Sequence, residues 1–224
     1  MKIEKITEKE VGSVTFLDIL GMKGIWQQDT NVLKKLHGLI QETRKRTKEI
    51  SDPYADLIEF QRFRGQEEIT KILSISDTIA MFTPGDSEKS IEIQAKICAW
   101  LLEFALLQGI PLRGAISYGE YMIKDNIMLG YAVDEAASWH ETTDWIGVVL
   151  SPSAQMKMKG KRVDAITTYN QIPFKKTERN LVMCVEWGVE DKDKLYEVIS
   201  WKGPHTPEIA PKYLNTLAFL HRSK

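Results

Sequence analysis

The sequence has few cysteines and almost no net charge. Its two cysteines among 224 residues, Cys98 and Cys184, form no C-x-x-C pair. This excludes a disulfide framework or a cysteine-rich zinc module and is typical of a reducing compartment. The formal net charge of −1 gives no reason to expect a nucleic-acid or membrane-surface binder.

The sequence also lacks a long apolar run. Its richest apolar stretch, residues 97–107, is interrupted by Glu103 and falls short of the roughly 18 residues that would span a bilayer. The first residues, Met1–Lys5, lack the apolar core of a signal peptide. We therefore expect a cytoplasmic protein with no membrane partner.

What the sequence does contain is the composition of a globular domain. Hydrophobic residues make up 43% of the chain and charged residues 27%, which allows a sizeable core. No repeat, low-complexity tract or Ser/Gly linker divides it, and domains typically have about 100–200 residues. We expect one domain over residues 1–224, with a core at about 13–150 and a C-terminal extension at 151–224.

Hydrophobic periodicity and turn residues predict the secondary structure. Strands are expected at 14–20, 69–73, 78–82, 112–118, 121–129, 146–150, 165–169 and 181–187. Helices are expected at 29–50, 86–108, 131–141, 151–158 and 207–221. The central order is β-α-β-β-α-β, which predicts a ferredoxin-like α+β fold, an antiparallel sheet covered by helices on one face.

Two aspartates stand in mainly apolar strands. Asp18 lies inside the strand at 14–20, and Asp77 lies near the tip of the hairpin that joins 69–73 to 78–82. These strands are usually neighbours in a β-α-β-β order, which would bring the carboxylates together. A buried carboxylate needs a partner, and two that lie together repel each other unless cations separate them. Mg²⁺ and Mn²⁺ prefer such hard oxygen ligands.

Glycines follow the first aspartate, at Gly21 and Gly24. Glycine lets backbone N–H groups approach phosphates where a strand turns into a helix, whose N-terminus favours anions. A metal pair with such an anion site indicates phosphoryl chemistry on a nucleotide. Taken singly, each aspartate favours a structural role, Asp18 as a strand-end cap and Asp77 as an Asx-turn residue. Their joint placement favours the metal pair.

Four segments resemble the class III nucleotidyl cyclases, over residues 13–150. Residues 16–22 (FLDILGM) resemble the F-x-D-x-x-G-F signature, with Met22 in place of the last Phe. Residues 76–77 (SD) resemble the Gly-Asp hairpin, and residues 113–120 (RGAISYGE) the R-x-G-I-H-x-G strand. The pair at 129–130 (LG), followed by a helix, resembles the W-G-D-x-V-N-x-A-A-R segment.

The resemblance implies a site, cofactors and partners. It implies that Asp18 and Asp77 bind two divalent cations, Mn²⁺ or Mg²⁺, with the help of the Ile19 carbonyl. It also implies a nucleoside triphosphate substrate and a homodimer whose active sites form across the interface. Lys175, after residues 172–174, loosely matches the family's triphosphate-binding lysine.

This chain departs from the family at four positions. Adenine-specifying cyclases carry a Lys four residues before the hairpin Asp and an Asp just before the W-G pair, where this chain has Leu73 and Ile127. The family's transition-state Asn and Arg fall on Asp134 and Ser138. The chain should therefore not read adenine in the usual way, and we expect a base pocket near Leu73 and Ile127. The combination resembles the bacterial pyrimidine cyclases of anti-phage Pycsar systems, whose cyclic UMP or cyclic CMP triggers a separate effector.

The remaining candidates have two readings each. Arg113 could bind phosphate as a fork donor or form a salt bridge at a strand edge. Lys23, with Gly21, Met22 and Gly24 in the same turn, could contact the triphosphate or be solvated. Phe16 shares a strand face with Asp18 and could pack on the nucleotide or in the core. The histidines, at 37, 140, 205 and 221, lack metal-ligand spacing and receive no role.

These observations predict an enzyme that converts UTP, before CTP, into the 3′,5′-cyclic nucleotide and pyrophosphate. The product would be an antiviral second messenger. Two alternatives stay open. Asp134 and Ser138 fit a non-catalytic nucleotide-binding regulator, and a purine cyclase with unusual base specificity would keep the same metal pair.

Overall fold

The computed structural model describes residues 9–21, 31–63, 68–176, 181–201 and 205–222. Its strands are β1 (Glu10–Ile19), β2 (Lys71–Ile75), β3 (Thr78–Pro84), β4 (Leu112–Lys124), β5 (Ile127–Leu129), β6 (Gly147–Leu150), β7 (Ile166–Thr168) and β8 (Met183–Val185). Its helices are α2 (Val32–Ser51), α3 (Lys89–Leu107), α4 (Tyr131–Trp139), α5 (Pro152–Met158), α6 (Lys192–Trp201) and α7 (Ala210–Leu220). Two 3₁₀ turns, Asp52–Tyr54 and Ile58–Phe63, occupy the segment at 52–64 that has no sequence prediction.

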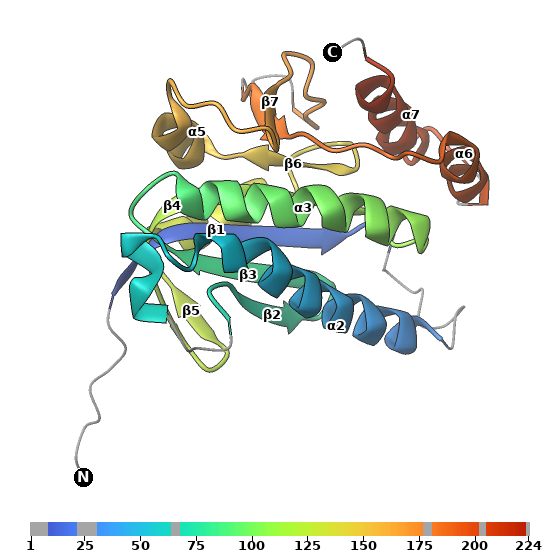
Figure 1. The fold of residues 1–224 in the computed structure, drawn as a ribbon. Coiled ribbons are helices and arrows are strands. Elements are labelled where there is room, and N and C mark those ends of the chain that lie inside the picture. Colours follow the sequence, from blue (N-terminus) through green and yellow to red (C-terminus); the bar gives the residue numbers. More distant parts are fainter. Residues whose placement is uncertain (1–8, 22–30, 64–67, 177–180, 202–204, 223–224) are drawn as a thin grey trace.

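The sheet has the predicted ferredoxin-like centre. Its strands run in the order β2-β3-β1-β4-β6-β8-β7, and β5 pairs with the far end of β4. The pairs β2–β3, β3–β1 and β1–β4 are all antiparallel, as a β-α-β-β-α-β chain requires. The mixed α+β fold is thus confirmed. The C-terminal strands β8 and β7 extend the same sheet beyond β6, and β7 lies above β6 in Figure 1.

Two features of the predicted architecture are wrong. The sheet is not wholly antiparallel, because β6 pairs with β4 in parallel. Helices also lie on both faces. In Figure 1, α2 and α3 cover one face, and the main apolar cluster joins α3 to Leu17 of β1. Helix α4 packs on the other face, where Ala132 and Ala136 join Val14 of β1 in a second cluster. Because successive side chains of a strand point to opposite faces, β1 serves both clusters.

The region 112–129 also differs from its prediction. A turn is expected at Gly119 and Glu120, but both lie inside β4, whose pairing with β1 runs without interruption from Leu112 to Tyr121. Gly119 keeps a positive φ of 154° within the strand. The chain reverses at Asp125, with φ of 54°, and this makes β5 a short strand. The strand pairing therefore overrides the local turn propensity of Gly119.

Other differences lie at element ends. Strand β1 begins at Glu10, earlier than predicted, and α6 at Lys192–Trp201 has no counterpart in the prediction. The predicted start of the first helix, residues 29–30, lies outside the described residues. The predicted end of α3 agrees well: Gly109 has a φ of 74°, and the Ile110 N–H donates to the Ala105 carbonyl. None of the described helices is both long and apolar enough to cross a membrane.

An ion-pair network ties the turn after α2 to α3. The Glu92 carboxylate accepts hydrogen bonds from Tyr54 (2.7 Å) and Lys89 (2.8 Å) and forms a salt bridge with Lys96 at 2.9 Å. Burial alone would raise the pKa of Glu92, but the hydrogen bonds from these three partners outweigh it and lower the pKa to about 2. The ionised form of Glu92 therefore stabilises the folded state.

We predict that Glu92→Gln lowers the free energy of unfolding at pH 7 by about 1–3 kcal/mol, because the bonds to a charged acceptor are lost. A carboxyl with a lowered folded pKa contributes stability above its unfolded pKa, and this contribution disappears as pH falls through the folded value. The difference between the wild type and Glu92→Gln should thus shrink between about pH 4.5 and about pH 2. Urea unfolding at several pH values measures it. Glu42→Gln is the control, since the Glu42 side chain is 44% exposed and its salt bridge to Lys45 is long at 3.9 Å. An equal loss in both variants would contradict the network's role.

Candidate active site

Asp18 lies near the end of β1, in the middle of the sheet. It is opposite Thr78 of β3 on one side and opposite Arg113 of β4 on the other. Its neighbours Leu17 and Ile19 point into the main apolar cluster, so Asp18 points to the α4 face with Phe16. Only 8% of Asp18 is exposed. An ionised carboxylate so buried requires compensating charge.

Asp77 lies beside this strand end, in the two-residue turn between β2 and β3. Ser76 takes a left-handed conformation, with φ of 56°, and reverses the chain. The Asp77 carbonyl then accepts a hydrogen bond from the Ile19 N–H at 3.1 Å. The Asp77 charge also acts on the Asp18 carboxyl. The structure therefore brings together the two aspartates that the sequence singles out.

Arg113 supplies the charge that faces Asp18. Its Nε and Nη2 donate to the same oxygen, Asp18 Oδ2, at 3.1 and 2.9 Å. Its Nη1 donates to the Thr143 carbonyl at 3.1 Å. Burial raises the pKa of Asp18, Arg113 lowers it, and the negative charges of Glu141 and Asp77 raise it. The net direction is upward, so the guanidinium only partly offsets the surroundings.

Lys175 approaches the same cluster from the C-terminal part. A short bridge between Thr143 and Phe174 joins the two segments, and the Lys175 N–H donates to the Thr142 carbonyl at 3.0 Å. Burial lowers the pKa of Lys175, and the positive charge of Arg113 lowers it further. The lysine that matches the family only loosely thus lies within electrostatic reach of Arg113.

The segment that the sequence predicts to bind phosphate, residues 21–24, is described only at Gly21. Gly21 has a φ of 81°, and a Cβ atom there would meet nothing within 4 Å. Glycine is therefore favoured at this position by the backbone conformation. Met22, Lys23 and Gly24 lie outside the described residues.

The two predicted base-pocket residues lie on different strands. Leu73 of β2 is partly buried and packs against the apolar cluster beneath α4. Met128, the residue after Ile127, packs against the same cluster. Ile127 itself is 67% exposed at the turn between β4 and β5. On α4, Asp134 and Ser138 are both exposed, and the Ser138 hydroxyl donates to the Asp134 carbonyl at 2.7 Å.

Sequence reasoning missed the contribution of the segment after α4. His140 lies edge-on to the Phe16 ring, 5.9 Å between ring centroids. Glu141 faces Asp18 electrostatically, and Thr143 offers its carbonyl to Arg113. No sequence signal could reveal Thr143, because its contribution to Arg113 is a backbone atom. The effect of Glu141 on Asp18 could not be predicted from the sequence, because the two residues lie far apart along the chain.

The donor set fits Mg²⁺ or Mn²⁺ only with help from other oxygens. Among the described residues, no three His, Cys, Asp or Glu side chains come close enough to hold a metal by themselves. Mg²⁺ in nucleotide sites is typically held by one or two carboxylates together with phosphate oxygens and water. The pair of Asp18 and Asp77 with the neighbouring Ile19 carbonyl matches that pattern.

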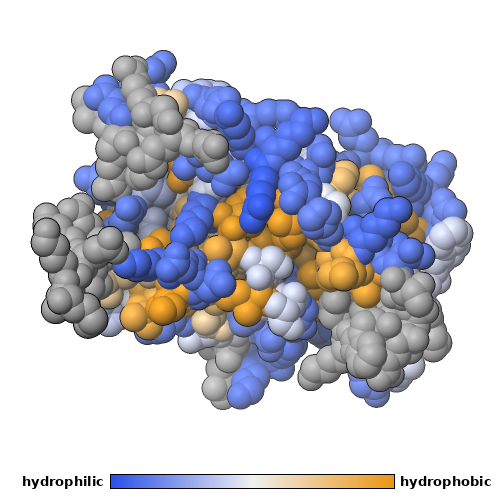
Figure 2. Space-filling model, turned by 90° about the horizontal axis from the view of Figure 1, so that it is seen from below, coloured by the Kyte–Doolittle hydropathy of each residue, from blue (hydrophilic) through white to orange (hydrophobic). Residues whose placement is uncertain are grey.

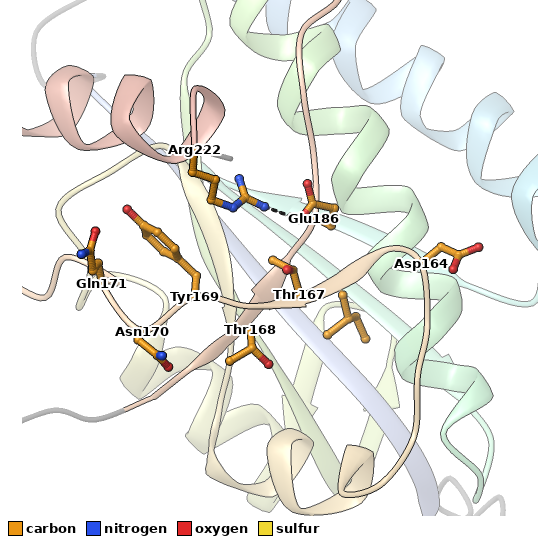
Figure 3. Close-up of a pocket in the computed structure, with 9 residues that line it drawn as sticks. Asp164, Thr167, Thr168, Tyr169, Asn170, Gln171, Glu186 and Arg222 are labelled. Carbon is orange, nitrogen blue, oxygen red and sulfur yellow. Dashed lines mark hydrogen bonds and ion pairs between the residues drawn. The ribbon is translucent and has the colours of Figure 1, made fainter. Parts of the chain in front are cut away.

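A separate cavity lies on the C-terminal part of the sheet. It has a volume of about 650 Å³ and is lined by residues 164 and 166–171, Glu186 and Arg222 (Figure 3). Arg222 pairs with Glu186, and its guanidinium lies 3.7 Å from the centroid of the Phe219 ring. Strands β4, β6 and β8 separate β7 from β1, and no predicted site residue lines the cavity. The candidate site is a charge cluster on the sheet, not this cavity.

Comparison with known proteins gives structural similarity alone. No protein-family model matches the chain, and no curated protein is similar to it. The similar solved structures include adenylate and guanylate cyclases. A rhodopsin-guanylyl cyclase catalytic core with converted specificity, in complex with ATPalphaS, has a TM-score of 0.49 and 14% identity, over 80% of this chain and 96% of that one.

Two further structures are similar. An adenylate/guanylate cyclase/hydrolase from Silicibacter pomeroyi has a TM-score of 0.47 and 16% identity, over 83% of this chain and 99% of that one. Adenylate cyclases from Trypanosoma brucei in their monomeric state have a TM-score of 0.44 and 11% identity, over 79% of this chain and 89% of that one.

The proximity of the two aspartates can be tested without a ligand. The negative charge of Asp77 raises the pKa of Asp18, so we predict that Asp77→Asn lowers the pKa of Asp18. Carbon-detected NMR titration of the side-chain carboxyl groups measures it. Asp86→Asn is the control, because the whole length of β3, about 20 Å, separates Asp86 from Asp77. If Asp77→Asn leaves the pKa of Asp18 as the control does, the carboxylates are not neighbours.

Proposed function

We propose that the chain is a nucleotidyl cyclase that converts UTP, before CTP, into the 3′,5′-cyclic nucleotide and pyrophosphate. The observation that carries the proposal is the cluster of Asp18, Asp77 and Arg113 at one end of the central strands. Two carboxylates beside a guanidinium and Lys175 form the charge pattern that a metal-bound triphosphate requires. The resemblance of residues 16–22 and 113–120 to class III cyclases supports the same reaction.

The side chains have separate roles in this proposal. Asp18 and Asp77 hold two divalent cations, Mn²⁺ or Mg²⁺, with the Ile19 carbonyl as a further ligand. Such cations, when bound, lower the pKa of the ribose 3′-hydroxyl and neutralise charge on the triphosphate. Arg113 and Lys175 bind phosphate oxygens as cationic donors.

The rest of the site orients the nucleotide. The turn at residues 21–24 lets backbone N–H groups approach the phosphates, with Gly21 at its start. Phe16, on the same face as Asp18, packs against the nucleotide. Catalysis then rests on the alignment of the 3′-hydroxyl with the α-phosphorus and on charge stabilisation, with no covalent intermediate on the protein.

The pyrimidine preference rests on the base pocket. Apolar Leu73 and Ile127 replace the residues that specify adenine in the family, and an apolar wall with few backbone donors suits a small ring. The product would act in the cytoplasm as an antiviral messenger read by a separate effector, as the resemblance to anti-phage cyclases implies.

A second copy of the chain is the proposed partner. Ile127 and Leu129 of β5 are 67% and 56% exposed, and Tyr131 at the start of α4 is 79% exposed. Strands β2 and β5 lie at the lower side of Figure 1. Figure 2 views the molecule from that side, with apolar residues gathered across the middle of the surface. An exposed apolar surface of this kind favours association, here with active sites completed across the interface.

The reaction is tested by incubating the purified protein with Mn²⁺ and each of the four ribonucleoside triphosphates. We predict cyclic UMP as the main product and cyclic CMP as the lesser one, identified by chromatography and mass spectrometry. Asp77→Asn should reduce the rate at least about a hundredfold, because bound metals contribute several kcal/mol to the barrier. Asp86→Asn, remote from the site, should keep the wild-type rate.

Absence of any cyclic product from UTP or CTP would contradict the proposal. Cyclic AMP or cyclic GMP instead would indicate a purine cyclase. The second candidate is a non-catalytic regulator, which the absence of a cationic side chain at Asp134 and Ser138 favours. Its signature is thermal stabilisation by a triphosphate without turnover, unchanged in Asp77→Ala.

A further inference from the structure

The ion pair between Arg113 and Asp18 uses every nitrogen of the guanidinium. Nε and Nη2 both bind Asp18 Oδ2, and Nη1 binds the Thr143 carbonyl. The two side chains are only 8% and 11% exposed. The pair is therefore a buried ion pair of defined geometry between β1 and β4, unlike a solvent-exposed salt bridge.

This contact places a positive charge where a divalent cation would bind. Asp18 faces the negative charges of Asp77 and Glu141, and Arg113 offsets them. A cation between Asp18 and Asp77 would lie next to the guanidinium, and like charges a few ångströms apart repel strongly in a partly buried site. Either the cation binds weakly or Arg113 leaves Oδ2.

The neighbouring cation Lys175 makes the departure of Arg113 from Asp18 costly as well. The backbone N–H of Lys175 donates to the Thr142 carbonyl, and burial together with the Arg113 charge lowers the pKa of Lys175. Glu141 and Asp144 act on Lys175 as negative charges. Arg113, however, would lose its own counter-charge if it left Asp18. A polyphosphate supplies that counter-charge and matches the fork geometry of the guanidinium.

We propose that Arg113 competes with divalent cations for Asp18, and that a polyphosphate removes this competition by taking Arg113 as its own partner. The metal and the polyphosphate then bind cooperatively, each increasing the affinity for the other by the same factor. Neither the metal nor the polyphosphate binds tightly in the absence of the other. The inference rests on the metal site of the proposed function, and it adds a gating role for Arg113.

The first test measures binding of Mn²⁺ alone, at pH 8, by electron paramagnetic resonance of the free ion. Arg113→Gln should bind Mn²⁺ at least about tenfold more tightly than the wild type, a difference of about 1.4 kcal/mol. Arg113→Lys, which keeps the charge but loses the fork, should lie in between. Arg46→Gln is the matched control, because Arg46 pairs with Glu49 on the exposed face of α2, and it should bind as the wild type does.

The second test is reciprocal and needs no metal. Inorganic tripolyphosphate is titrated calorimetrically into each protein in the presence of EDTA. Asp18→Asn should bind it at least about tenfold more tightly than the wild type, because Arg113 is released. Asp77→Asn also removes one negative charge, but it does not release Arg113. It should therefore tighten tripolyphosphate binding about threefold or less, which is the size of effect expected from one partly exposed charge.

Two results would overturn the proposal. One is Mn²⁺ affinity in folded Arg113→Gln that equals the wild-type affinity or falls below it. The other is tripolyphosphate affinity in Asp18→Asn no higher than in Asp77→Asn, and this second test decides the matter if Arg113→Gln does not fold. Neither test uses a nucleotide or turnover. A protein that makes no cyclic product can therefore still pass both, and an active cyclase can fail them.

Discussion

The ion pair between Asp18 and Arg113 is the interaction on which the candidate site depends. Asp18 lies on the central strand β1, so its position is fixed by β3 on one side and β4 on the other. A charge at such a place costs several kcal/mol unless a partner compensates it. The guanidinium offsets part of this cost without ligand, and divalent cations take over in the loaded state that we propose. The buried carboxylate of Asp18 thus pairs with one cation at a time, either the Arg113 guanidinium or a metal ion.

Much of this arrangement could be predicted from the sequence, because it depends on local patterns. The apolar strand around Asp18, the hairpin that ends at Asp77 and the β-α-β-β-α-β order follow from hydrophobic periodicity and turn residues. Together these place the aspartates on neighbouring strands. The capped helix α3 is equally local, ending at Gly109 as expected.

The rest depends on contacts that no local pattern encodes. Gly119 reads as a turn, yet pairing with β1 keeps it inside a strand of 13 residues. The position of α4 on the second face follows from how the small residues Ala132 and Ala136 pack beneath the sheet. Lys175 reaches the site only through the bridge between Thr143 and Phe174. The exposed apolar surface around Ile127 likewise appears only once β5 is seen as a hairpin arm.

The most direct test of the central claim, that Asp18 and Asp77 form one metal site for a triphosphate, is a crystal structure with Mn²⁺ and 3′-deoxy-UTP, which lacks the attacking hydroxyl. Anomalous scattering at the manganese edge locates the ions independently of the fitted chain. We expect anomalous peaks between the two carboxylates, with the triphosphate beside Arg113 and Lys175. Manganese bound elsewhere, or a triphosphate seated away from β1, would contradict it.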